Sequence, residues 1–177
     1  MRIIQGKYKN RRFFIPKNLK IRPTTDRAKE SLFNILTNMY DFKKIKVLDL
    51  FSGSGNISYE FCSRGSIVTC VEMNKKCIQY IFKTSETFGM NNIIHQKNTF
   101  RFLKTCKEKY NVIFADPPFN FSKDLYSKLI KLIFDKELIT SDGIIIIEHS
   151  SFLNFKEHNN FLKSKKYGDI NFSFLKN

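Results

Sequence analysis

The stretch VLDLFSGSGNIS, residues 47–58, places a short apolar run directly before two glycines and a polar segment. Gly53 and Gly55 stand where a buried strand would end and a helix would begin. Glycine at such a junction permits a tight turn and lets a ligand approach amide groups that a side chain would shield. The stretch therefore predicts a strand, a loop and a helix, with a ligand site at the loop.

Outward from this stretch, short β-rich runs alternate with longer segments of helical pattern. Strands are expected over 46–51, 67–72, 92–96, 111–115 and 143–148, and helices over 25–39, 56–64, 74–88, 98–106 and 122–137. This alternation is typical of an α/β fold with a mostly parallel sheet and helices on both faces. Tyr167, Gly168 and Asp169 predict a turn between two antiparallel strands at the edge of that sheet.

Length and composition indicate one domain, because 177 residues with 42% hydrophobic content suffice for one substantial core. We place its boundary at residue 23, so that 23–177 form the α/β domain and 1–22 a basic extension whose first 16 residues form a short hairpin. The longest aliphatic run, 144–147, is far below the ~20 residues of a membrane span, so neither an anchor nor a signal peptide is expected. The cysteines and histidines lack metal-ligand spacing, which indicates reduced thiols, a cytoplasmic location and no metal; the cysteines are Cys62, Cys70, Cys77 and Cys106.

The net charge of +15 indicates a polyanionic partner, because lysine and arginine side chains that pair with phosphates release condensed counterions. Part of this charge could reflect the A/T-rich codons that also explain the abundance of Lys, Asn, Ile and Phe. The distribution is more informative than the total, since residues 1–22 contain no acid. Their basic residues predict a nucleic-acid contact, with a solvated basic tail as the alternative; they are Arg2, Lys7, Lys9, Arg11, Arg12, Lys17, Lys20 and Arg22.

Two acidic residues indicate which ligand the glycine loop binds. The dinucleotide fingerprint G-x-G-x-x-G is absent because Ser58 replaces its third glycine. Asp49, inside the end of the first strand, would repel a phosphate and attract an amino group. Glu72 closes the second strand, where an acid accepts hydrogen bonds from ribose hydroxyls. A helix cap and an exposed strand end are the alternatives; together the two acids predict a nucleoside with a cationic amino acid end, and S-adenosylmethionine fits.

The stretch VIFADPPF, residues 112–119, ends another strand with an acid, two prolines and an aromatic residue. It resembles the catalytic loop of methyltransferases that act on exocyclic amino groups of nucleobases. Asp116 and the carbonyl group of Pro117 would accept hydrogen bonds from the amine and hold it in line with the methyl donor. Pro117 and Pro118 fix the backbone, and Phe119 would stack on the base. A structural turn with Phe119 in the core is the alternative.

Several further stretches carry a resemblance that runs from residue 2 to about residue 174: IIQGKYKNRRF, RPTTDRAKESLFNIL, LDLFSGSGNIS, VEMN, FADPPF, GIIIIEHS and KYGDINFSF. Together they are similar to the bacterial family that methylates the 2-amino group of a guanine in 16S ribosomal RNA. RPTTDRAKESLFNIL is the most specific of them, because DNA methyltransferases share the amino-methyltransferase motifs but not this block. The resemblance implies a Rossmann-like class I methyltransferase that uses S-adenosylmethionine during small-subunit assembly.

The resemblance also implies roles for individual residues. The methionine end of the cofactor would be lined by Asp49, Ser52, Gly53 and Gly55, with Glu72 on the ribose and Met73 beside the adenine. Asn98 stands where the family usually has an acid that accepts from the adenine amino group, so weaker cofactor binding is expected. The target base or its phosphates would be contacted by Arg22, Thr24, Thr25 and Arg27.

Three functions remain open from the residues. The leading hypothesis is a 16S rRNA guanine-N2 methyltransferase, monomeric and without metal or membrane, acting on the small subunit or an assembly intermediate. A DNA adenine-N6 methyltransferase would need a target-recognition insertion for which the chain has no room. A non-catalytic RNA-binding assembly factor would not need the intact acids and glycines. His149 could face the site, although a histidine at a strand end more often has a structural role.

Overall fold

The computed structural model describes residues 1–16, 19, 21 and 24–176, which contain a seven-stranded sheet. Its spatial order is β3-β2-β1-β4-β5-β7-β6. The strands are β1 Lys46–Leu50, β2 Ile67–Glu72, β3 Ile93–Gln96, β4 Tyr110–Ala115, β5 Ile139–Ser150, β6 Phe161–Tyr167 and β7 Ile170–Lys176. The first five strands pair in parallel, whereas β7 is antiparallel to both β5 and β6. The predicted parallel sheet with a C-terminal hairpin edge is confirmed.

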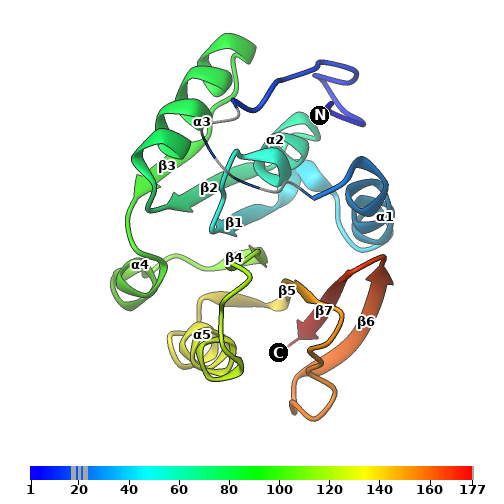
Figure 1. The fold of residues 1–177 in the computed structure, drawn as a ribbon, viewed down its shortest axis with the longest axis vertical. Coiled ribbons are helices and arrows are strands. Elements are labelled where there is room, and N and C mark those ends of the chain that lie inside the picture. The colour runs from blue at the N-terminus through cyan, green and yellow to red at the C-terminus, as the bar shows by residue number, and fades with distance from the viewer. Residues whose placement is uncertain (17–18, 20, 22–23, 177) are drawn as a thin grey trace.

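Helices cover both faces of this sheet (Figure 1). They are α1 Asp26–Thr37, α2 Asn56–Ser63, α3 Lys75–Phe88, α4 Thr99–Thr105 and α5 Lys123–Asp135, with a short 3-10 turn, η2, at Phe42–Lys44. Figure 1 shows α1, α2 and α3 on one side and α4 and α5 on the other. Four of the helices begin after a residue whose side-chain oxygen accepts from a first-turn amide, namely Thr25, Asn74, Asn98 and Ser122.

Strand β5 is the element that departs most from its expected length, because 143–148 grows to Ile139–Ser150. At its start, Ile139 pairs with Tyr110 across an irregularity in the ladder. At its end, Ser150 pairs with Ile170 of the antiparallel neighbour β7. Both extensions depend on partner strands, which the apolar pattern of residues 143–148 does not reveal.

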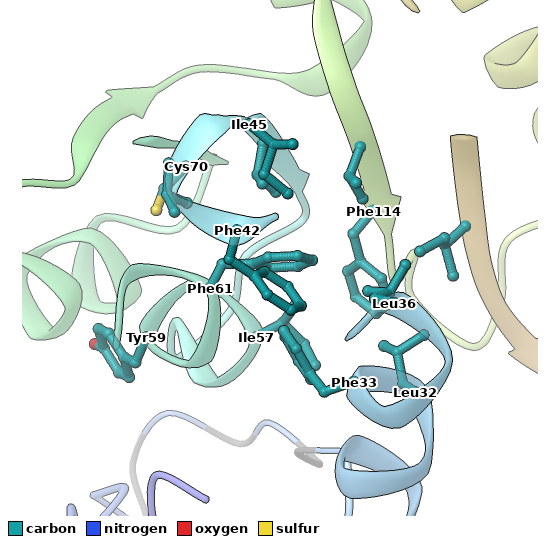
Figure 2. Packing of buried hydrophobic residues seen from close by; sticks show 14 of the residues in the cluster. Leu32, Phe33, Leu36, Phe42, Ile45, Ile57, Tyr59, Phe61, Cys70 and Phe114 are labelled. Atoms are coloured by element: carbon teal, nitrogen blue, oxygen red, sulfur yellow. The ribbon is translucent and has the colours of Figure 1, made fainter. Parts of the chain in front are cut away.

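Two apolar clusters form the core, one on each face. On the α1 side, Phe33, Phe42 and Phe61 meet between helix and sheet (Figure 2), with the Phe33 and Phe61 ring centroids 4.6 Å apart. The Arg64 guanidinium lies 4.8 Å from the Phe33 centroid. On the other face, α5 buries Leu129, Ile130 and Ile133 among other residues. Each such side chain contributes about 1.5–3 kcal/mol by leaving water.

The N-terminal segment turns back on itself and packs against the domain. The predicted hairpin forms as a single bridge between Arg2 and Arg12, beside a 3.0 Å hydrogen bond from the Ile3 amide to the Arg11 carbonyl. No strand of this segment joins the seven-stranded sheet within the described residues. Its apolar side chains belong to the α1-side core cluster; they are Ile3, Tyr8 and Phe13.

A buried ion pair between α1 and α2 holds the backbone of this segment through hydrogen bonds. The Lys29 ammonium lies 3.5 Å from Glu60, and neither side chain is exposed. Glu60 also accepts hydrogen bonds from the Ile4 and Gln5 amides at 2.9 and 3.0 Å. Desolvation lowers the pKa of Lys29, although the Glu60 charge opposes that shift. Such pairs are costly to break singly, about 3–5 kcal/mol, so the segment is an integral part of the fold.

Candidate functional site

The carboxyl ends of four parallel strands open into one cavity of about 1050 Å³. Asp49 of β1 pairs in register with Phe114, and Asp116 and Glu148 directly follow the pair Ala115 and Ile147. Because successive side chains of a strand alternate between faces, these three acids share the face that α1 covers. The cavity thus lies between the strand ends and the start of α1.

The glycine loop between β1 and α2 has an unusual backbone. Phe51 adopts φ +62°, followed by Gly53 at +54° and Gly55 at +79°. A Cβ atom added at Gly55 would lie 2.7 Å from the Tyr59 ring, whereas one at Gly53 would meet nothing closer than 3.9 Å. Ser52 and Gly53 line the cavity as predicted, but Gly55 lies outside the lining. Gly55 is therefore required for the turn, where it leads into α2.

Asp49 provides a negative group at the base of the loop. Its side chain is buried, and its carboxylate accepts a hydrogen bond from the Ser58 hydroxyl. Desolvation raises the pKa of Asp49 to about 7, the Ser58 hydrogen bond opposes this shift, and the charges of Glu72 and Glu148 add to it. A cationic group in the cavity would favour the ionised carboxylate. The buried Asp49 carboxylate, as a hydrogen-bond acceptor, suits an ammonium group and disfavours a phosphate.

Glu72 lies on the far side of the same loop and is held by the main chain. Its carboxylate accepts from the Gly53 amide at 3.0 Å, and from the Met73 and Asn74 amides at 2.8 and 2.7 Å. Met73 is 65% exposed and lines the cavity beside it. A carboxylate has about four acceptor sites and these amides occupy three, so one site on Oε2 can still accept from a ligand hydroxyl.

Asn98 also lines the cavity, at the start of α4. Its side-chain oxygen accepts from the Arg101 amide at 3.2 Å and so caps that helix. Helix capping was not part of the predicted role of Asn98. Aspartate caps helices about as well as asparagine, so the cap does not explain why this chain has the amide.

The loop after β4 carries the predicted catalytic residues into the cavity. Asp116, Pro117, Pro118 and Phe119 all line it, and Phe119 is 75% exposed. Desolvation raises the pKa of Asp116 well above its ordinary value, and the charges of Glu148 and Asp49 add to this shift. Phe121 anchors the loop, since its ring packs edge-on against that of Tyr126, with the ring centroids 4.9 Å apart. The alternative with Phe119 in the core is wrong.

Glu148 is a buried acid of the cavity that the sequence pattern did not single out. It follows Ile147 at the end of β5 and is buried beside Asp116. The Thr24 hydroxyl donates to its Oε2 atom at 2.7 Å, and the Thr24 carbonyl accepts from the Asn56 side chain at 3.0 Å. Glu148 could have been found from the sequence. The predicted strand 143–148 ends in this acid, the predicted strand 111–115 leads into Asp116, and parallel strands end at one edge of a sheet.

His149 has a structural role, as histidines at strand ends often do, and does not face the cavity. Strand alternation turns it to the opposite face from Glu148. Its Nδ1 atom lies 2.8 Å from the Ser150 carbonyl oxygen and its Nε2 atom 2.8 Å from the Ser173 hydroxyl. A carbonyl oxygen only accepts, so Nδ1 carries the proton. Desolvation lowers the pKa of His149, which favours the neutral ring.

The predicted RNA-binding residues separate into two groups. Thr24, Thr25 and Arg27 line the cavity at the start of α1. The others that the structure describes are exposed and lie outside the cavity lining; they are Arg2, Lys7, Lys9, Arg11 and Arg12. Lys17, Lys20 and Arg22 lie outside the described residues.

The N-terminal turn, residues 7–10, lies far from the cavity. The Lys7 amide donates to the carbonyl of Ser63, the last residue of α2, and the Tyr8 hydroxyl donates to the carbonyl of Gly89, which follows α3. Both helices begin at the cavity, and the 14 residues of α3 span about 21 Å. The turn therefore sits at the opposite end of the domain.

Two kinds of feature are absent from the part of the chain that the structure describes. Its His, Cys, Asp and Glu side chains form no group of three or more that could hold a metal ion. Its helices are all too short or too polar to cross a bilayer. All four cysteines are free thiols.

Comparison with known proteins places the chain among ribosomal RNA methyltransferases. The family model described as "Conserved hypothetical protein 95" matches residues 1–176. Ribosomal RNA small subunit methyltransferase D of Buchnera aphidicola subsp. Baizongia pistaciae is 36% identical, covering 100% of this chain and 92% of the relative.

Solved structures agree with this placement. A putative methyltransferase from Escherichia coli superposes with a TM-score of 0.82 at 29% identity, covering 98% of this chain and 96% of its own. The fold is also that of the Thermus thermophilus 16S rRNA N2 G1207 methyltransferase, solved in complex with AdoMet and guanosine. That match has a TM-score of 0.70 at 18% identity and covers 86% of this chain and 43% of the other. This chain therefore belongs to the ribosomal RNA small subunit methyltransferase D family, whose model carries the description conserved hypothetical protein 95.

Proposed function

We propose that this enzyme transfers a methyl group from S-adenosylmethionine to the 2-amino group of one guanine in 16S ribosomal RNA. One observation carries the proposal: a single cavity joins Asp49 and Glu72 on one side to the Asp116 loop on the other. The naming of its curated relative as a small-subunit rRNA methyltransferase, and the guanosine bound by the structural neighbour, support the substrate.

The cofactor half would hold S-adenosylmethionine through the residues described above. Asp49 would face the ammonium group, Glu72 the ribose hydroxyls, and Met73 the adenine ring, with Ser52 and Gly53 along the methionine end. When bound, the cofactor supplies an electrophilic methyl group. The cavity fits this ligand because its first acid suits a cation and its second retains an acceptor site for a ribose hydroxyl group.

The Asp116 loop would orient the target amine. The lone pair of a guanine 2-amino group is delocalised into the ring, so the nitrogen is a poor nucleophile. Hydrogen bonds from its two N–H groups to the Asp116 carboxylate and the Pro117 carbonyl would favour a tetrahedral nitrogen and fix its direction. As the nitrogen becomes cationic, the Asp116 charge stabilises it, and the acidic N–H then passes its proton to solvent water, so that no protein base is obligatory. Phe119 would stack on the base, a contact worth about 1–3 kcal/mol.

The two groups of candidate RNA-binding residues would have different roles. Thr24, Thr25 and Arg27 would contact the nucleotide at the cavity. Lys7 and Lys9, at the opposite end of the domain, would contact phosphates remote from the target base. The second group would therefore add salt-dependent affinity without affecting the chemical step.

Salt titration tests this division. Lys7→Gln with Lys9→Gln should lower the slope of log affinity against log salt by about one per lysine and leave the turnover of bound substrate unchanged. Lys104→Gln with Lys107→Gln removes the same charge from exposed residues of α4 and the following loop. Equal effects of the two double variants would reject a specific contact by the N-terminal turn.

The finer identity of the partner is part of the proposal. We propose a cytoplasmic monomer that acts on the small subunit or on an assembly intermediate, with residues 1–22 as the RNA-contacting extension of the 23–177 methyltransferase domain. Methylation of naked 16S RNA, of assembly intermediates and of complete subunits, compared side by side with duplex DNA, identifies the substrate.

Mass spectrometry of 16S RNA from cells with and without the protein is the direct test of the function. Loss of one N2-methylguanine is expected when the protein is absent. When it is expressed in cells that lack the protein, the Asp116→Ala variant should accumulate and should retain RNA on a filter. It should not restore the methyl group. Loss of RNA retention to the same degree would show that Asp116 has been assigned the wrong role.

A further inference from the structure

Two loops form a part of the cavity rim to which the proposed function assigns no role. The turn between β6 and β7 lines the cavity with Lys166, Tyr167, Gly168, Asp169 and Ile170. The loop after β5 begins beside this turn, because the Ser151 amide donates to the Asp169 carbonyl at 2.9 Å. We call residues 151–153 and 166–170 the hairpin rim.

Phe152 is the most exposed of the large apolar side chains that the structure describes, at 95%. The main chain fixes its position, since the Leu153 amide donates to the Ser150 carbonyl at 3.0 Å and closes a tight turn around it. A single exposed phenylalanine on a protein surface needs no explanation. One that a turn holds beside the cavity of an enzyme presents an aromatic face to the molecule that enters.

Phe152 also lies beside the loop that would hold the target base. Ser150 and Leu153, on either side of it in the chain, line a small recess whose wall includes Asp116 and Phe119. The nucleotide next to a base held by Asp116 would therefore pass close to the hairpin rim. Phe152 itself belongs to the lining of neither the cavity nor the recess, so its ring suits that neighbour rather than the target base.

The hairpin rim and the cavity interior differ in charge. Four acids line the interior, namely Asp49, Glu72, Asp116 and Glu148. Lys166 of the rim is exposed, and it forms no ion pair with any described residue, including Asp169 of the same turn. An RNA phosphate would therefore be repelled by the interior and attracted to Lys166.

We propose that the hairpin rim binds the nucleotide next to the target guanine, with Phe152 stacked on its base and Lys166 paired with its phosphate. An exposed aromatic ring beside a basic side chain is the arrangement that binds single-stranded nucleic acid. This inference rests on the proposed function and adds a requirement to it. The neighbour of the target guanine must have one face of its base free of other stacking.

A double-mutant cycle between protein and RNA tests the stacking contact. The 16S RNA is prepared by ligation with an abasic residue on the 5′ or on the 3′ side of the target nucleotide. It is used free or assembled into subunits, in whichever form the wild-type enzyme methylates. Phe152→Ala should lower kcat/KM on unmodified RNA about tenfold, within the range of about 5- to 150-fold for one base–aromatic stack.

One of the two abasic residues should lower the wild-type kcat/KM by a similar factor. The same abasic residue should have no further effect on Phe152→Ala, because the stack has already been removed. Phe82→Ala, at a 61% exposed phenylalanine of α3, is the matched control. It should have the wild-type kcat/KM and keep the full sensitivity to the abasic residue.

Salt titration tests the phosphate contact. Lys166→Gln should lower the slope of log affinity against log salt by about one. Lys136→Gln removes the same charge from the exposed residue that follows α5 and should leave the slope unchanged. Lysine on an edge strand also discourages pairing between molecules. If Lys166→Gln promotes self-association without changing the slope, the phosphate contact is rejected.

An abasic residue that lowers kcat/KM equally in wild type and in Phe152→Ala would overturn the inference. Phe152 would then contact something other than the neighbouring base, such as a ribosomal protein. Wild-type activity of Phe152→Ala on unmodified RNA would overturn it as well. Failure of the wild-type enzyme on unmodified 16S RNA would reject the proposed function instead, so the two failures are distinguishable.

Discussion

The two halves of the cavity are held by different kinds of interaction. On the cofactor half, three backbone amides donate to the Glu72 carboxylate. On the target half, no hydrogen bond reaches the Asp116 carboxylate from any part of the chain that the structure describes, and its neighbouring acids are Glu148 and Asp49. Glu72 is thus preorganised by the main chain, whereas the Asp116 carboxylate is disfavoured by burial and by the neighbouring acids.

This difference suits the two ligands. The cofactor is the same in every turnover, so backbone donors can be aimed at a fixed acid. In the proposed reaction the target amine must be recognised and activated, and the Asp116 carboxylate retains its full capacity to accept from it. The raised pKa of Asp116 is the electrostatic cost of that arrangement.

The largest effect is expected from Asp116→Asn. Methyl transfer should fall about 10²- to 10³-fold, as when one preorganised electrostatic group is removed from an active site. Cofactor affinity should stay the same, because the substitution lies in the target half. Single-turnover methylation and calorimetry with S-adenosylmethionine measure the two. A parallel loss of cofactor affinity would show that the halves are not separate.

Glu72→Gln should chiefly weaken cofactor binding, by about 10- to 100-fold. The substitution removes a charge that three amides and the ribose hydroxyls share, and hydrogen bonds to charged groups contribute about 1.5–3 kcal/mol each. Calorimetry should show this loss, with turnover at saturating cofactor nearly retained. Glu86→Gln, an exposed acid of α3, is the matched control. A fall in saturated turnover alone would contradict the assignment.

Asp49 should make cofactor binding depend on pH. Its pKa in the empty protein is about 7, so at lower pH the acid is mostly protonated. It must then lose its proton before it can pair with an ammonium ligand. Affinity should therefore fall about tenfold per pH unit below 7 and level off above it. Asp49→Asn should bind weakly at every pH, without this slope. A wild-type affinity that is flat between pH 5 and 8 would exclude Asp49 as the ammonium partner.

The same pKa sets the sign of a stability effect. The folded-state pKa of Asp49 lies above its unfolded value of about 3.9, so its favourable contribution is complete below pH ~4 and is lost as pH rises through about 7. Thermal unfolding without cofactor should therefore show Asp49→Asn gaining stability relative to wild type across that range. A constant difference in Tm from pH 4 to pH 8 would contradict the shift.

Phe119→Leu should have a smaller effect, confined to the target half. Loss of the stacking surface should lower kcat/KM for the RNA substrate about tenfold, within the range for one base stack, with cofactor affinity unchanged. Phe82→Leu makes the same substitution at a 61% exposed phenylalanine of α3. If both variants lose activity equally, Phe119 does not stack on the target base.

The smallest effect is expected from Asn98→Asp. A carboxylate accepts more strongly than an amide from the adenine amino group, so S-adenosylmethionine affinity should rise a few-fold. The helix cap should survive, because both residues cap well, and Tm should hardly change. Calorimetry that shows no gain, or a loss, would exclude Asn98 from contact with the adenine.

Most of the fold could be predicted from the sequence because it depends on local patterns. Apolar runs followed by glycines, acids or prolines located the parallel strands, and helical spacing located the helices to within about two residues at each end. The residues that line the cavity at Asp49, Glu72 and Asp116 were predictable for the same reason. Parallel strands end at one edge of a sheet, so acids at their ends converge.

What the local patterns could not reveal are contacts between segments far apart in the chain. Thr24 and Glu148 are separated by 124 positions, and Ile4 and Glu60 by 56. The buried Lys29 looks like any polar residue of an amphipathic helix, and Lys7 looks as well placed for RNA at the cavity as Arg27. Only tertiary packing decides these cases, because burial and hydrogen bonding depend on which neighbours the folded chain supplies, and no periodicity in the sequence specifies them.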